Sequence, residues 1–117
     1  MTLDESLLAL SLGGHCSNVA IALDLLSSGD EKFVQRGRTY IESGLKGLSP
    51  YLKSEEFMKK VSKTEAAKIV ESFRRFAQIK DYSALDKEEL DQYKQLFHNL
   101  SASFDSLAKE TETAYPF

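Results

Sequence analysis

The pattern of apolar and polar positions is dominated by residues 6–23, an uninterrupted stretch without a charged side chain. Apolar residues in and just after this stretch would cover most of the circumference of a helix, which is typical of a helix in a protein core. Thr2 and Glu5 have the spacing of a capping box just before it. The sequence therefore predicts a buried first helix over about residues 3–26.

Residues 6–23 also have about the length of a membrane span or a secretory signal, but their composition argues against both. A signal segment begins with basic residues, whereas Asp4 and Glu5 precede this stretch. A membrane span needs about 20 predominantly apolar residues, and residues 13–18 are mostly small or polar. We therefore expect a core helix and no membrane attachment.

Two glycines in the interior of this helix, Gly13 and Gly14, cost about 2 kcal/mol relative to alanine. They indicate either a kink or close packing against a neighbouring helix, and we favour close packing. The weakly polar side of the helix is uncharged and carries small residues, which suggests that either extra segments of the chain or a second subunit cover it. The homodimer contact predicted on this basis consists of Ser11, Gly14, Ser17 and Asn18.

Apolar residues and glycines recur at three- and four-residue spacing over residues 33–48, which predicts a second amphipathic helix. A capping box at residues 28–31 would start this helix, and residues 47–50, with glycine and proline, would end it. Gly37 and Gly44 lie on its apolar face. Two turns of the second helix can therefore approach a partner closely.

Two more helices are predicted in the remaining sequence. Ser54 and the acids after it would start the third helix, which a capping box at residues 62–65 can split into a short and a long part. A capping box at residues 86–89 would start the fourth helix, whose apolar stripe continues over residues 90–111. Residues 111–117 have no helical period and are predicted to form a frayed tail.

These elements define the predicted fold class. No segment shows the alternation of a strand, and no internal repeat is present. Four main helices joined by short connections are typical of an up-and-down bundle. We therefore predict a single all-α domain over residues 1–117, a four-helix bundle in which the first helix can be kinked and the third can be split.

Charge changes sign along the chain. The net charge of −3 is divided into −5 for residues 1–31, +7 for residues 32–80 and −5 for residues 81–117. In an up-and-down bundle the first and fourth helices are neighbours, so one side of the molecule should be acidic and the other basic. We expect the basic side to bind an acidic protein surface through Arg36, Arg38, Lys68, Arg74 and Arg75.

The same basic segment, residues 32–80, suggests a nucleic-acid or phosphate binder as the alternative function. The isoelectric point near 5.4 makes this alternative the weaker one, since the acidic half of the molecule would repel a polyanion.

The pair His15 and Cys16, which follows the two glycines, is the one local feature that suggests chemistry. A thiol at a helix amino terminus can be activated, but a lone cysteine is more often a small core residue. The only other histidine, His98, lies outside the apolar stripe of the fourth helix, and no Glu-x-x-His motif is present. We therefore expect no catalytic residues, no metal and no cofactor, with a thiol or metal site at His15 and Cys16 as a distant alternative.

Together these observations predict a small non-catalytic protein that binds another protein, such as an adaptor, an inhibitor or an immunity-type module. The single cysteine rules out an internal disulfide and suits a reducing compartment. We therefore expect a cytoplasmic location.

Overall fold

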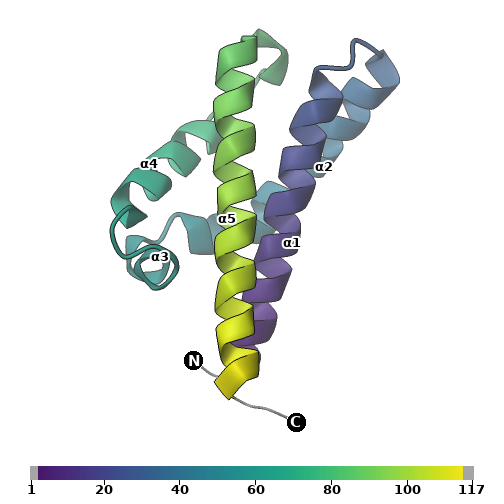
Figure 1. Cartoon of the computed structure of the whole chain (residues 1–117). Coiled ribbons are helices and arrows are strands. Elements are labelled where there is room, and N and C mark those ends of the chain that lie inside the picture. The colour runs from purple at the N-terminus through teal and green to yellow at the C-terminus, as the bar shows by residue number, and fades with distance from the viewer. Residues whose placement is uncertain (1–2, 115–117) are drawn as a thin grey trace.

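The computed structural model describes residues 3–114 of the 117-residue chain and is all-α over that range, as predicted (Figure 1). Its elements are α1 (Leu3–Leu26), α2 (Glu31–Leu52), α3 (Glu55–Val61), α4 (Ala66–Ala77), the short 3-10 turn η1 (Tyr82–Ala84) and α5 (Lys87–Ala114).

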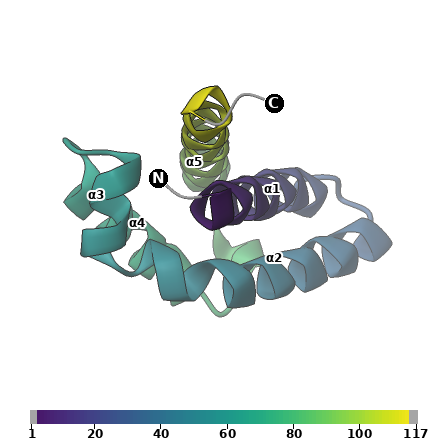
Figure 2. The same ribbon diagram turned by 90° about the horizontal axis from the view of Figure 1, so that it is seen from below.

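The long helix α1 lies between α2 and α5 and makes its most extensive contacts with these two helices (Figure 2). On the other side of the core, α3 and α4 pack on each other and contact α2, and α3 also contacts α5. This packing fits the predicted four-helix bundle, with α3 and α4 in the place of one third helix. The predicted split of the third helix is confirmed.

The first helix runs without interruption from Leu3 to Leu26, as predicted, while the proposed capping residue Thr2 lies outside the described residues. At Gly13 the chain packs closely on α5, since a Cβ there would lie 2.9 Å from Oδ1 of Asp105. The choice of close packing over a break is therefore confirmed for Gly13. A buried hydroxyl strengthens the same contact, because Ser6 donates a hydrogen bond of 3.2 Å to a main-chain carbonyl of α5.

The second helix packs on α1 through its glycines. A Cβ at Gly37 would lie 2.8 Å from the carbonyl oxygen of Ala22, and a Cβ at Gly44 would lie 2.6 Å from a methyl group of Val19. Real Cβ atoms do not approach other atoms this closely, so larger residues would push the helices apart. The prediction that these two glycines allow a close approach is confirmed, and the partner is α1.

The capping predictions are confirmed at α3 and α5 and wrong at α2 and α4. Before α4 the hydroxyl of Ser62 accepts from the N–H of Glu65, but the helix begins only at Ala66 and its cap residue makes no side-chain capping hydrogen bond. Ser54 accepts a hydrogen bond from the third residue of its helix. Asp86 accepts from the main-chain N–H of Glu89, and Glu89 accepts in return from that of Asp86, which is a complete capping box. At α2, however, the cap is Asp30 and not Ser28, whose hydroxyl instead accepts from the N–H of Asp30 in the turn.

Two predicted helix ends were placed too early. Residues 47–50 do not end α2, which continues to Leu52 with Pro50 inside its last turn, because a proline so near the end removes only one intrahelical hydrogen bond. Residues 111–114 belong to α5 and not to a tail. Each residue added to α5 adds one helical hydrogen bond. From the start of α5 to Pro116 the sequence contains no glycine and no proline that would end the helix. Residues 115–117 of the predicted tail lie outside the described residues.

Aromatic rings fill the space between α4 and α5. The ring centroids of Phe76 and Phe97 are 4.9 Å apart with an edge-to-face tilt, and those of Phe76 and Tyr93 are 5.1 Å apart. Phe73 packs on the same ring of Phe97 and is fully buried. Large side chains join α4 to α5, whereas glycines join α1 to α2.

Candidate functional site

The large apolar side chains that are exposed to solvent gather on α1 and on the first half of α2. Five such side chains are found among the described residues, with exposed fractions between 41% and 57%: Leu7, Leu10, Ile21, Phe33 and Tyr40. Together with the small or polar residues between them on α1, Ser11, Gly14, Ser17 and Asn18, they form a surface that we call the α1 outer face.

The α1 outer face exists because the other sides of α1 are occupied. Leu12, Cys16 and Leu23 point into the core and are buried. Gly13 and Ser6 meet α5, and Val19 and Ala22 meet α2. The positions left over recur every three or four residues from Leu7 to Ile21, so they line up along one side of the helix.

Phe33 and Tyr40 join this surface from α2. They lie four residues before and three residues after Gly37, on the helix face that contacts α1 through Gly37 and Gly44. Since Gly37 reaches Ala22 and Gly44 reaches Val19, Tyr40 emerges beside the segment of α1 around residues 19–22.

The residues of the predicted dimer contact all lie on the α1 outer face. Ser11, Gly14 and Asn18 are exposed, and Ser17 is half-buried at its border with α5. A Cβ at Gly14 would have no atom within 4 Å, whereas a Cβ at Gly13, Gly37, Gly44 or Gly47 would touch another helix. The contact with a second subunit itself remains a prediction.

The α1 outer face carries no charge over most of its length. The next charged residues along α1 are Glu5 before it and Asp24 after it, and Asp24 pairs with Lys94 of α5 at 2.8 Å. The hydrogen bond to Asp24, with a second to Asp91, raises the pKa of Lys94. An uncharged, partly apolar surface of this kind suits contact with another apolar surface.

Sequence reasoning assigned the large residues of this face to the core. Leu7, Leu10 and Ile21 were counted among the apolar residues of a buried helix, and Phe33 and Tyr40 among those of a buried face. The signal that could have identified Phe33 and Tyr40 is their alternation with glycines, because a neighbouring helix held close by the glycines leaves no room beneath the larger side chains.

The five basic residues of the predicted binding surface have different surroundings: three have partners within the chain, and two are exposed. Arg38 pairs with Asp81 at 3.6 Å, and Arg75 pairs with Glu71 on its own helix at 3.2 Å. Arg74 donates a hydrogen bond of 3.2 Å to the main-chain carbonyl of Lys53. The remaining two, Arg36 and Lys68, are exposed. Arg36 lies three residues after Phe33 and so borders the α1 outer face.

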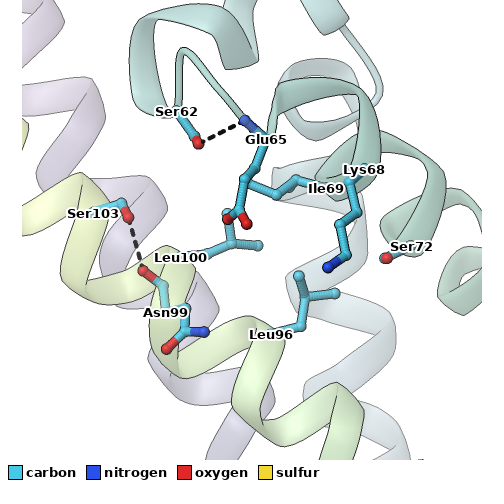
Figure 3. A pocket seen from close by; sticks show the side chains of 9 residues that line it. All are labelled: Ser62, Glu65, Lys68, Ile69, Ser72, Leu96, Asn99, Leu100 and Ser103. Carbon is cyan, nitrogen blue, oxygen red and sulfur yellow. Dashed lines mark hydrogen bonds between the residues drawn. The ribbon is translucent and has the colours of Figure 1, made fainter.

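Lys68 lies at a cleft of about 260 Å³ between α4 and α5 (Figure 3). Leu96, Leu100 and Ile69 supply its apolar lining, and its polar lining consists of Ser62, Glu65, Lys68, Ser72, Asn99 and Ser103. The hydrogen bonds drawn there are local ones, from the N–H of Glu65 to Ser62 and from Ser103 to the carbonyl of Asn99. The volume is just below the roughly 300 Å³ at which small-molecule sites begin.

A second, more apolar groove of about 240 Å³ lies where α1, α3 and α5 meet. It is lined by Glu5, Leu8, Ala9, Tyr51, Phe57, Lys60, Val61, Phe104 and Leu107. The rings of Tyr51 and Phe57, with centroids 5.3 Å apart, shape one wall of this groove.

His15 and Cys16 point in different directions. Cys16 is fully buried in the core, and desolvation raises the pKa of its thiol to about 12. The ring of His15 lies against Gly47 of α2, whereas His98 is exposed on α5. Among the described residues no three His, Cys, Asp or Glu side chains form a group that could hold a metal ion.

Within residues 3–114, α1 is the one helix long and apolar enough to cross a membrane, over Asp4–Leu26. Half of the most apolar part of that segment is buried against the other helices. Comparison with protein-family models, with curated proteins and with solved structures finds no match. The fold and the surface together define an all-α helical domain with one uncharged, partly apolar face.

Proposed function

We propose that this protein acts by binding another protein and not by catalysis, and that the α1 outer face is the surface that binds. The observation that carries the proposal is the gathering of five exposed large apolar side chains on the α1 outer face, whose part on α1 is uncharged. Scattered single apolar residues are normal on protein surfaces, but a contiguous group of them usually marks an interaction site.

The composition of the face supports this function. Leu7, Leu10 and Ile21 form a ridge along α1, and the aromatic rings of Phe33 and Tyr40 stand beside it. Aromatic anchors contribute most of the binding energy at many interfaces, whereas polar residues at the rim contribute orientation and specificity. Arg36, exposed at the rim, gives the face a positive edge that favours an acidic residue on the partner.

The test is to compare protein capture by two variants that add the same charge at different places. Leu10→Asp with Ile21→Asp places two carboxylates in the α1 outer face. Ala67→Asp with Ala102→Asp places two on exposed positions of α4 and α5. Proteins captured from an extract of the native host by the unchanged chain are identified by mass spectrometry, and each purified candidate is titrated against all three forms.

We expect the dissociation constant of a true partner to rise at least about 30-fold for the first variant, because charges in the centre of an apolar contact are desolvated without a counter-ion. It should change less than about threefold for the second variant. Circular dichroism and chemical unfolding of both variants verify that the fold is intact. A partner that binds both variants with equal affinity would remove the α1 outer face from the proposal.

A further inference from the structure

We infer that the α1 outer face binds a second copy of this chain, with the two α1 helices antiparallel and the two-fold axis passing Gly14. The inference rests on the proposed function, since it names the partner of the same surface. Four observations carry it: the mirrored order of the residues, the open space at Gly14, the position of opposite charges, and the size of the face.

The residues of the face are arranged nearly symmetrically about Gly14. Leu7 and Ile21 each lie seven residues from it, and Ser11 and Ser17 each lie three residues from it. A two-fold axis that reverses the helix direction at Gly14 therefore places Leu7 of one copy against Ile21 of the other. Each such contact occurs twice, as an isologous interface requires, and the serines meet near the centre. One unlike pair, Leu10 and Asn18, lies four residues from the axis.

Gly14 lets the two backbones approach each other. It lies in the middle of a 24-residue helix, where a glycine costs about 0.8–1 kcal/mol relative to alanine. The other glycines inside α1 and α2 each face an atom of another helix, but a Cβ at Gly14 would have no atom within 4 Å. Within one copy, therefore, the small size of Gly14 serves no contact, and on the proposed axis it serves the contact with Gly14 of the second copy.

Opposite charges meet in the antiparallel arrangement. Asp4 lies ten residues before Gly14. Arg36 directly precedes Gly37, and Gly37 contacts Ala22, Leu25 and Leu26 of α1. Arg36 therefore lies beside the part of α1 that is about ten residues after Gly14. Reversal of the helix at Gly14 therefore places Asp4 of each copy opposite Arg36 of the other. Both side chains are exposed in the single chain.

The size of the face predicts a weak dimer. From Leu7 to Ile21 the helix rises about 21 Å, and α1 with α2 beside it is about 20 Å wide, which gives roughly 400 Å² per copy. The total of about 800 Å² is below the roughly 1,200 Å² at which stable specific interfaces begin, and it is in the range of weak, transient contacts. We therefore expect a dissociation constant of about 1–100 μM and a monomer at nanomolar concentration.

Sedimentation equilibrium from 1 to 500 μM measures this association directly. The unchanged chain should shift from monomer to dimer within that range, and Ala67→Asp with Ala102→Asp should do the same. Leu10→Asp with Ile21→Asp should weaken the association at least about 30-fold. A chain that stays monomeric at 500 μM would overturn the inference, as would a dimer that is unchanged by the two substitutions in the face.

Cysteine cross-linking measures the direction of the helices. A mixture of Leu7→Cys chains and Ile21→Cys chains should form mixed disulfide dimers on mild oxidation, and each variant alone should form few. In the antiparallel arrangement two copies of residue 7 are about 21 Å apart along the helix, far beyond the roughly 7 Å that a disulfide can span between Cα atoms. A parallel arrangement would give the opposite pattern, in which each variant links to itself, and would overturn the inference.

A charge exchange tests the register. Arg36→Glu and Asp4→Lys should each weaken dimerisation several-fold, and the double variant should restore it, because the interaction is re-formed with reversed signs. Additive weakening in the double variant would contradict the proposed two-fold axis.

The outcomes separate the two proposals. A monomeric chain whose α1 outer face still binds a different protein overturns the second copy as occupant and leaves the proposed function in place. Flotation with phosphatidylcholine–phosphatidylglycerol vesicles tests whether the α1 outer face binds a lipid surface instead. Recovery of the unchanged chain with the vesicles, and not of Leu10→Asp with Ile21→Asp, would make a lipid surface the occupant and overturn both proposals.

Discussion

Gly14 and Gly44 are both interior glycines of long helices, yet a methyl group should have opposite effects at the two positions. At Gly14 the added Cβ would face open space, whereas at Gly44 it would lie 2.6 Å from a methyl group of the fully buried Val19. The first position is limited only by helix propensity, and the second is limited by the distance between two helices.

We predict that Gly14→Ala raises the free energy of unfolding of the monomer by about 0.8 kcal/mol, because alanine restricts the unfolded chain and favours the helix. Gly44→Ala should lower it by about 1 kcal/mol, since overpacking of 1–3 kcal/mol exceeds the gain in propensity. Urea unfolding at submicromolar concentration measures both values.

Val19→Ala provides the control for Gly44→Ala. In a Val19→Ala background the methyl group that obstructs the new Cβ is gone, so Gly44→Ala should become neutral or stabilising. Equal effects in both backgrounds would show that the contact with Val19 does not set the cost.

Cys16 should behave as an inert core residue at neutral pH. Burial raises the pKa of its thiol from 9.0 to about 12, so the folded state keeps a proton that the unfolded state loses above pH 9. The free energy of unfolding should therefore fall as the pH rises from 9 to 12, by up to about 1.4 kcal/mol per pH unit from this group. Urea unfolding at several pH values measures the slope, and Cys16→Ala should make it shallower.

Reaction with a thiol reagent gives an independent measurement on Cys16. At pH 8 the folded chain should not react until it is unfolded, because the thiol of Cys16 is buried and protonated in the folded state. Rapid modification of the native chain would contradict the buried position.

At the scale of the elements, short polar signals determine where α3 and α5 begin. Ser54 caps α3, and the reciprocal hydrogen bonds of Asp86 and Glu89 cap α5. These bonds involve residues only three apart, so they form independently of the rest of the fold. The end of α2 has no such signal, since the helix continues past Pro50 to Leu52.

Asp86→Ala should lower the free energy of unfolding by about 1 kcal/mol, since it leaves N–H groups of the first turn of α5 without a partner. Asp86→Asn is the matched control, because asparagine also caps helices and should restore most of the stability. Thermal unfolding followed by circular dichroism measures both. Equal losses for alanine and asparagine would indicate that the charge of Asp86, and not its capping hydrogen bond, stabilises the helix.

At the scale of the whole molecule, the path of the chain arranges charge. The segments of net charge −5 at the two ends contain α1 and α5, which are neighbours, and the segment of net charge +7 contains most of α2 and all of α3 and α4. The part of the α1 outer face on α1 lies between acidic α5 on one side and basic α2 on the other. A partner on this face therefore meets acidic residues on one flank and basic residues on the other, which makes its orientation sensitive to charge.

The helices and their packing partners could be predicted from sequence to different degrees. Periodicity predicted the helices and capping predicted the starts of α3 and α5, and the seven-residue separation of Gly37 and Gly44 predicted a close approach before the partner was known. The same pattern could not separate buried from exposed positions on α1, because Leu12 and Leu10 look alike in a helix that is apolar on every side. It also could not tell that Arg38, Arg74 and Arg75 find partners within the chain.

The sequence by itself determined that this chain is all-α, where most helices begin, and that α1 has an uncharged side, because these properties depend on residues within a few positions of one another. Only the tertiary structure decided which side of α1 remains open. The helices α5 and α2 and the core each cover one side of α1. The remaining side, with Gly14 at its centre, stays exposed because no other helix of the chain packs on it.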